Sequence, residues 1–371
     1  MKIKLMYIFS NIEISHAFEW MAEYTNADRY DVHYVFMNSV IPPLAQRLNE
    51  KGFQTHVIKY NGKKDLPVAS WNLFRLMKKV KPDIVHTHLF DANIAGLTVA
   101  KICGVKKRIY TRHHSTFHHH YHPHGVKYDR YCNSLATHIV AITKNVADVL
   151  IKMENVPSKK ISIVHHGFDF NNFKTVDAAR IQNISDKYNP SKCKPVIGVI
   201  SRFTEWKGVQ YIIPAFKKLL NDYPDAILIF ANSGGDYKNE IENLLKDLPA
   251  NNFKKIGFEQ DFIALYKFFD VFVHVPVDAH SEAFGQVYVE ALAAQLPCVF
   301  TLSGIANDFI KNEANAVVVD YKNENEIYNA LVKILNDKNF ADRISTQGKK
   351  DVAQLFSIER MITQLEKVYE Q

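Results

Sequence analysis

Short runs of β-branched and aromatic residues alternate along the chain with longer segments in which apolar residues recur at helical spacing. In the first half, the runs that predict strands are residues 3–9, 31–36, 55–60, 84–87, 108–111, 138–142 and 161–164. Helical spacing lies between them, at residues 15–25, 42–51, 70–80, 92–102, 126–135 and 144–153. This alternation is typical of a parallel sheet with helices on its faces, so the first half is predicted to form one doubly wound α/β unit.

A polar stretch, residues 169–194, interrupts this pattern and predicts a connection with one helix. The alternation then restarts. Strands are predicted at residues 196–201, 226–231, 253–256, 271–275, 298–302 and 316–319, and helices at 208–220, 237–247, 261–269, 286–295 and 325–335. The sequence therefore predicts an α/β fold of two Rossmann-like domains that face each other across a cleft, with ligands at the carboxyl ends of the strands.

We place the first domain at residues 1–180 and the second at residues 181–350. A last amphipathic segment, residues 358–369, follows the final predicted strand. Because its apolar stripe needs a partner surface, residues 351–371 are expected to form a helix that crosses back and packs on the first domain.

The composition is that of an ordinary globular protein. At roughly 100 to 200 residues per domain, 371 residues predict two domains, and 47% hydrophobic with 23% charged residues excludes the disordered and fibrous classes. No apolar run approaches the roughly 20 residues of a membrane span, so we expect a soluble or peripheral protein. The cysteines are scattered and show no CxxC spacing, which favours free thiols in the cytoplasm. They are Cys103, Cys132, Cys193 and Cys298.

The net charge of +7 is unevenly divided. Residues 1–180 hold 25 lysines and arginines against 14 aspartates and glutamates, whereas residues 181–371 hold 21 against 25. Part of the basic surplus lies in residues 71–82, where Trp71 and Phe74 stand beside Arg75 and several lysines. Such a segment is either an interfacial helix on an anionic membrane or a core-packed helix with a solvated basic face. Nucleic acid is not expected, because the aromatic residues do not interleave with the basic ones.

Two cations follow the first strand of the second half, in the segment SRFTEWKG. Arg202 and Lys207 lie on the loop between this strand and the next helix, which Gly208 opens. Unpaired backbone N–H groups and the helix dipole favour an anion at such a place. The alternative is a pair of solvated surface charges, but the position at a strand's carboxyl end favours a diphosphate site.

Two carboxylates lie in the segment SEAFGQVYVEALAAQLP. Glu282 precedes Gly285 and a predicted helix, and Glu290 lies on that helix with seven residues between the two glutamates. A carboxylate is a bidentate acceptor that suits the vicinal hydroxyls of a ribose. The alternative makes Glu290 an exposed helix residue and Glu282 an N-terminal cap.

Together, in this order, the two segments resemble the signatures of glycosyltransferase family four, retaining enzymes of GT-B architecture that use nucleotide sugars. The likeness extends over nearly the whole chain. It implies an acceptor-binding first domain and a donor-binding second domain, with Arg202 and Lys207 on the donor diphosphate, Glu290 on the ribose and Glu282 on the sugar. Backbone groups of Phe284, Gly285, Gln286 and Val287 would contact sugar and phosphate. The chain departs from the family at Gln295, at residues 303–308 and at residues 10–12, where the family usually has glycines.

Seven histidines lie within the twelve residues 113–124. Such density suggests a metal site, but an exposed loop that binds metal only adventitiously is the favoured interpretation, and no metal is predicted. His113 differs from the others because it follows a strand in a Thr-x-His arrangement that resembles the family's histidine near the donor sugar. The resemblance gives it a hydrogen bond to a sugar hydroxyl. His86 and His88, in another strand end, are either pocket lining or satisfied structural histidines.

The sequence thus predicts a metal-independent, retaining glycosyltransferase of the hexosyltransferase type, with Arg202, Lys207, His113 and Glu282 as its catalytic residues. Its donor would be a UDP- or GDP-linked sugar, and its acceptor a glycan or lipid-linked hydroxyl in bacterial surface glycan synthesis, at the cytoplasmic membrane face. Domain closure is expected to bring His113 toward Glu282. The alternatives are a nucleotide-sugar epimerase of related fold and a non-catalytic nucleotide-sugar binding module. A nicotinamide-dependent oxidoreductase is disfavoured because neither half contains a G-x-G-x-x-G turn.

Overall fold

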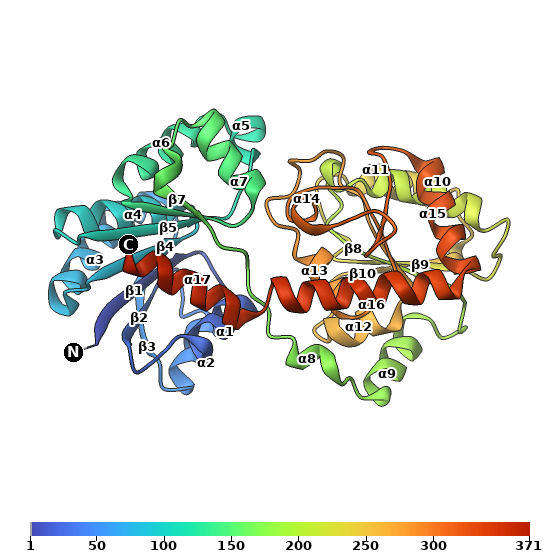
Figure 1. Cartoon of the computed structure of the whole chain (residues 1–371), viewed down its shortest axis with the longest axis horizontal. Coiled ribbons are helices and arrows are strands. Elements are labelled where there is room, and N and C mark those ends of the chain that lie inside the picture. The colour runs from blue at the N-terminus through green and yellow to red at the C-terminus, as the bar shows by residue number, and fades with distance from the viewer. Residues whose placement is uncertain (1) are drawn as a thin grey trace. The chain divides into compact units, whose positions relative to one another are not determined.

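The computed structural model describes residues 2–371 as two compact units, shown in Figure 1. Unit 1 comprises residues 1–168 and 356–371, and unit 2 comprises residues 169–355. Unit 2 therefore begins before residue 181, the start that the sequence predicts, and ends after residue 350, the predicted end. The physical reason is local: α9 (Ala178–Tyr188) packs on α12 (Phe262–Phe268), and Arg180 binds Asp261, so the whole connection belongs to the second core.

Unit 1 is built on a seven-stranded sheet in the order β3-β2-β1-β4-β5-β6-β7, in which every strand pair is parallel. The strands are β1 (Ile3–Ser10), β2 (Tyr30–Asn38), β3 (Gln54–Lys59), β4 (Ile84–His88), β5 (Lys107–Arg112), β6 (His138–Ala141) and β7 (Ile161–Ile163). The main helices are α1 (His16–Tyr24), α2 (Pro43–Glu50), α3 (Leu66–Val80), α4 (Phe90–Ile102), α5 (Phe117–Tyr121), α6 (Gly125–Leu135) and α7 (Lys144–Asp148). Two apolar clusters cover opposite faces of the central strands, as a doubly wound sheet requires.

Unit 2 is built on a six-stranded parallel sheet in the order β10-β9-β8-β11-β12-β13. The strands are β8 (Val196–Ile200), β9 (Ile227–Ala231), β10 (Phe253–Ile256), β11 (Val271–His274), β12 (Cys298–Phe300) and β13 (Val317–Val318). Its further helices are α8 (Asn171–Lys174), α10 (Val209–Leu219), α11 (Lys238–Leu245), α13 (Gln286–Ala293), α14 (Ala306–Phe309), α15 (Glu324–Asn336) and α16 (Lys338–Leu355). The neighbouring pair β8 and β11 is central, and each of these strands carries predicted site residues in the loop that follows it.

The last helix, α17 (Ile358–Glu370), belongs to unit 1, as predicted. Its apolar stripe packs against α1 and the face of β1, where Figure 1 shows it beside the first sheet. At its end, the hydroxyl of Tyr369 lies 2.7 Å from the hydroxyl of Tyr7 and 2.7 Å from Nδ1 of His86. These contacts fix the end of the helix to the middle of the sheet.

Every strand that the sequence predicts is present within a few residues of its predicted limits. Within residues 2–371, no helix is both long enough and apolar enough to cross a bilayer. The main element that the pattern did not predict is α16, the longest helix of unit 2.

Candidate functional site

The loop after β8 carries Arg202 and Lys207. Lys207 ends a short 3₁₀ turn (Glu205–Lys207), and Gly208 then starts α10 with a φ of +74°. A Cβ atom at Gly208 would lie 1.8 Å from the carbonyl oxygen of Val275, so only glycine lets this loop approach the end of β11 so closely. The close approach brings the side chain of Lys207 to the loop that follows β11, whereas the side chain of Arg202 is exposed.

Glu282 is the centre of a buried polar cluster. Its carboxylate forms an ion pair with Lys207, and its Oε1 lies 3.0 Å from Nε2 of His274. Its backbone N–H donates to Oγ of Ser303 over 3.0 Å. Since Glu282 is only 8% exposed, Lys207 and His274 hold the carboxylate in one position, and Ser303 fixes the backbone beside it.

The partners also keep Glu282 ionised. Burial by itself raises the pKa of a carboxyl, but the charge of Lys207 and the hydrogen bond from His274 outweigh it and lower the pKa of Glu282 to about 2. Burial lowers the pKa of His274, which is therefore neutral at pH 7 and donates its Nε2–H to the carboxylate. The cluster thus offers a fixed negative charge and a lysine whose ammonium group is only partly exposed.

Between Glu282 and α13 lies Gly285, and the helix follows it as the sequence predicts. Gly285 is left-handed, with a φ of +84°, and is the N-cap residue of α13. Glu282 is therefore not the cap of this helix, which excludes its structural alternative. Phe284 is buried and accepts a hydrogen bond from the backbone N–H of Ile305 over 2.9 Å, while Gln286 is exposed and Val287 partly buried.

Glu290 lies on α13 and is partly buried, so it is not the exposed helix residue of the alternative interpretation. Its Oε2 accepts a hydrogen bond from the hydroxyl of Tyr266 over 2.9 Å. Burial raises the pKa of Glu290 to about 7, against the opposing effect of this hydrogen bond. Near neutral pH the carboxyl group is therefore half protonated, and a ligand that donates hydrogen bonds to it would shift it to the ionised form.

In unit 1, His113 lies just beyond the end of β5. Its Nε2 is 3.1 Å from Nδ1 of His88, and its ring stacks on His166 with the centroids 5.4 Å apart. Burial, with a smaller contribution from neighbouring histidines, lowers the pKa of His113 well below its usual value. His113 is thus neutral at pH 7.

His86 is a structural residue. It is fully buried, and both of its ring nitrogens are within hydrogen-bond distance of side-chain hydroxyls. Nδ1 of His86 lies close to the hydroxyl of Tyr369, and Nε2 of His86 lies 2.8 Å from the hydroxyl of Thr111. Of its two sequence interpretations, the satisfied core histidine is the one that the structure supports.

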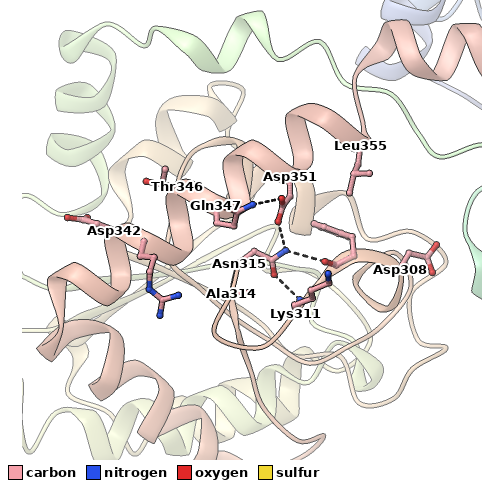
Figure 2. Close-up of a pocket in the computed structure, with 11 residues that line it drawn as sticks. Asp308, Lys311, Ala314, Asn315, Asp342, Thr346, Gln347, Asp351 and Leu355 are labelled. Atoms are coloured by element: carbon pink, nitrogen blue, oxygen red, sulfur yellow. Dashed lines mark hydrogen bonds between the residues drawn. The ribbon is translucent and has the colours of Figure 1, made fainter.

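A separate hollow of about 920 Å³ lies beside α16 in unit 2. Figure 2 shows Asn315 at its wall, where Nδ2 donates to Asp351 over 2.8 Å and to the carbonyl of Phe309 over 3.1 Å. Its lining includes none of the residues predicted to bind the donor. We therefore separate it from the candidate donor site.

Sequence reasoning did not identify His274, Ser303 or Tyr266 as neighbours of the two glutamates. His274 ends β11 and Ser303 follows β12, so a position at a carboxyl strand end was the available signal. Tyr266 lies on α12, and no sequence pattern connects it with Glu290.

Two family models match the chain and together cover most of it. Residues 18–172 match the model described as glycosyltransferase family 4, and residues 180–351 match the model described as glycosyl transferases group 1. All but the last four residues of the first match lie in unit 1, and the second match lies in unit 2.

The chain is also similar to individual glycosyltransferases and to a solved structure. The chain is 25% identical over 315 residues to an Escherichia coli UDP-Gal:α-D-GlcNAc-diphosphoundecaprenol α-1,3-galactosyltransferase, covering 80% of this chain and 78% of that protein. It is 26% identical to the Staphylococcus aureus capsular polysaccharide biosynthesis glycosyltransferase CapM, covering 91% of this chain and 96% of CapM. The crystal structure of Anabaena HepE in complex with UDP and glucose superposes with a TM-score of 0.85 at 18% identity, over 99% of both chains.

Proposed function

Because the chain belongs to glycosyltransferase family 4 and has GT-B architecture, we propose that it transfers a hexosyl unit from a nucleoside diphosphate sugar to an acceptor hydroxyl with retention of anomeric configuration. The observation that carries this proposal is the Lys207–Glu282–His274 cluster at the carboxyl ends of β8 and β11. It supplies fixed charges where an open α/β sheet binds its ligand.

In the proposed reaction, the bond between the anomeric carbon and the diphosphate breaks, and negative charge develops on the leaving nucleoside diphosphate. Arg202, Lys207 and the backbone N–H groups at the start of α10 stabilise that charge. Lys207 is held in advance by Glu282, so little reorganisation accompanies the step. These groups take the role that a divalent cation has in other glycosyltransferases, and we propose that the reaction needs no metal.

Glu290 accepts hydrogen bonds from the ribose hydroxyls, and the backbone from Phe284 to Val287 contacts the sugar and its phosphate. Glu282 contacts the sugar ring through its carboxylate. His113, which burial keeps neutral, forms a hydrogen bond with a sugar hydroxyl. The acceptor attacks from the face that the diphosphate leaves, so no protein nucleophile takes part.

We further propose a lipid-linked or surface-glycan acceptor and peripheral binding to an anionic membrane. The name of the Escherichia coli relative contains a lipid-linked acceptor, and the name of the Staphylococcus aureus relative refers to capsular polysaccharide biosynthesis. On α3, Val68 and Trp71 are 64% and 61% exposed, while Leu73 and Met77 pack into the core. The ring of Trp71 stacks on Phe74, and the exposed Arg75, Lys78 and Lys79 surround this apolar face. This combination suits lipid headgroups.

The proposal is tested with a panel of UDP- and GDP-linked sugars in a thermal-shift assay, because a bound donor stabilises the folded state by mass action. The best donor is then incubated with undecaprenyl diphosphate acceptors, in EDTA and with added Mg²⁺ or Mn²⁺. We expect transfer in EDTA and an axial or equatorial product linkage that matches the donor, as read by NMR. Inversion would refute retention, and loss of transfer in EDTA that Mn²⁺ restores would refute metal independence. A changed donor without any acceptor product would indicate an epimerase.

A further inference from the structure

Three side chains from separate elements of unit 1 converge beside the end of β5. His114 follows β5, His118 lies in α5 and Asp129 lies in α6. Nε2 of His114 is 3.4 Å from Oδ1 of Asp129, and Nδ1 of His118 is 2.7 Å from Oδ2 of the same carboxylate. One nitrogen or oxygen from each residue lies within 4.8 Å of the other two.

These distances are close to those of a metal site. Ligand atoms about 2.0–2.1 Å from a tetrahedral Zn²⁺ lie about 3.3 Å from one another. The separation of 3.4 Å between His114 and Asp129 matches that spacing and is long for a hydrogen bond. The 2.7 Å between His118 and Asp129 is shorter than this spacing and has to lengthen when an ion binds.

The side chains around Asp129 fix its orientation, and together they carry more negative than positive charge. Arg112 is 1% exposed and lies 3.0 Å from Oδ1 of Asp129 and 2.6 Å from Oε1 of Glu154. Asn133 donates to Oε2 of Glu154 over 2.7 Å. One guanidinium thus faces two buried carboxylates, with Nε2 of His119 also 3.2 Å from Oε1 of Glu154, and a cation bound at Asp129 would add positive charge where the guanidinium is shared.

Two further observations show that the pair of histidines is tightly placed. A Cβ atom at Gly125 would lie 2.8 Å from the ring of His118, so α6 approaches this ring as closely as only glycine allows. Nδ1 of His114 is buried and has no hydrogen-bond partner among residues 2–371. It is not the nitrogen that lies 3.4 Å from Asp129, so an ion bound at Nε2 leaves it unpaired.

We propose that His114, His118 and Asp129 bind one Zn²⁺ ion, with water as the fourth ligand, and that this ion fastens residues 114–118 to α6. This site is separate from the proposed transfer reaction, which needs no metal. Histidine nitrogen and carboxylate oxygen are ligands that Zn²⁺ accepts, and neighbouring groups that fix their orientation, as Arg112 does for Asp129, accompany most such sites.

The test uses the full chain without a histidine tag, titrated with Co²⁺ and read by visible absorption, then with Zn²⁺ against a chromophoric chelator. We expect one equivalent, with the intense absorption of four-coordinate Co²⁺, and displacement of Co²⁺ by Zn²⁺. His118→Gln and Asp129→Asn should each lose the absorption and weaken Zn²⁺ binding by at least tenfold, the size of effect seen for lost partners around metal ligands. If either of these variants does not fold, His114→Gln replaces it, because the side chain of His114 is more exposed than those of the other two ligands.

The matched control is the double variant His120→Gln/His124→Gln, which removes two exposed histidines of the same segment. It should retain the full Co²⁺ spectrum. The proposal is overturned if the control and not His118→Gln loses the binding, or if wild type gives only the weak absorption of six-coordinate Co²⁺. Either result would make the binding adventitious. Neither depends on glycosyl transfer.

Discussion

Lys207 and Glu282 form an ion pair between the loop that follows β8 and the loop that follows β11. Both side chains are largely buried, so each holds the other at the carboxyl edge of the sheet. The pair gives the lysine two roles, in the proposed stabilisation of the leaving diphosphate and in the compensation of a buried carboxylate.

Replacement of Lys207 by alanine is expected to lower turnover by about 10²- to 10³-fold, because a preorganised charge at the leaving group is lost. It should also lower the free energy of unfolding by about 3 kcal/mol, since Glu282 stays buried without its cation. Steady-state kinetics and urea unfolding measure the two effects. Lys217→Ala, which breaks an exposed pair with Asp247, is the matched control and should change neither quantity. Near-normal transfer by Lys207→Ala would remove the proposed role.

Donor binding should strengthen as the pH rises from 6 to 8. Burial raises the pKa of Glu290 to about 7, and the ionised carboxylate is the better acceptor for ribose hydroxyls. A nucleoside diphosphate sugar is a suitable probe because its diphosphate keeps the same charge over this range. Calorimetry should show affinity rising toward a plateau above the pKa of Glu290, and weak, pH-independent binding to Glu290→Gln. The same pH dependence in both proteins would contradict the ribose assignment.

The raised pKa of Glu290 also affects stability. Its folded pKa lies above the ordinary value of 4.5, so its contribution is complete below pH 4.5 and is lost as the pH rises to about 7. Glu290→Gln should therefore be more stable than wild type above pH 7, and the difference should shrink below pH 5. Melting temperatures of the two proteins measured across this range test the sign.

His113→Ala is expected to reduce kcat by about 10²-fold while the free nucleotide binds normally, because the proposed hydrogen bond is made to the sugar. Burial keeps His113 neutral, so its protonation should add no step to the pH–rate profile above pH 6. His120→Ala, an exposed histidine of the same segment, is the control. Equal kcat values in these two variants would exclude the role of His113.

Tyr369→Phe should destabilise the protein by about 1–3 kcal/mol. Its hydroxyl bridges Tyr7 and His86, and both would remain buried without it. Tyr30→Phe is the matched control, because the buried hydroxyl of Tyr30 has no partner in the described chain. Chemical unfolding of the two variants should show a clear decrease in the free energy of unfolding for Tyr369→Phe and little change for Tyr30→Phe.

The membrane proposal predicts that the protein cosediments with vesicles of phosphatidylglycerol and phosphatidylcholine, and less so in high salt. The double variant Val68→Ser/Trp71→Ser should reduce the bound fraction about tenfold, because it removes the exposed apolar side chains of α3. Tyr128→Ser/Tyr131→Ser, on α6, removes comparable exposed aromatic area and is the control. Equal loss in both variants would contradict a specific role for α3.

The sequence predicted the sheets because each buried strand is a compact apolar run between polar segments. It did not predict α16, whose buried stripe has only Phe340, Ile344 and Val352 as apolar members, with Gly348 in the place of a fourth. A glycine gives no hydrophobic signal and a poor helix propensity, although its position packs well against the rest of unit 2.

For the candidate site, the motifs predicted which loops carry charge but not which side chains meet. Glu282 and Lys207 are 75 positions apart, and their contact depends on the adjacency of β8 and β11. Likewise, the histidines of residues 113–124 look alike in sequence. The structure divides them into a neutral neighbour of His88, two neighbours of Asp129, one neighbour of Glu154 and three exposed residues. Tertiary structure, which local pattern does not contain, makes these distinctions.

Unit 2 is an insertion in unit 1, because α17 completes a core whose other members precede residue 169. During synthesis, nearly two hundred further residues are therefore made after the first sheet before α17 covers the apolar face of β1. An apolar face that stays uncovered for that time is a target for chaperones and for aggregation. Residues 169–355, by contrast, are continuous in sequence and can form their core as soon as they have been made.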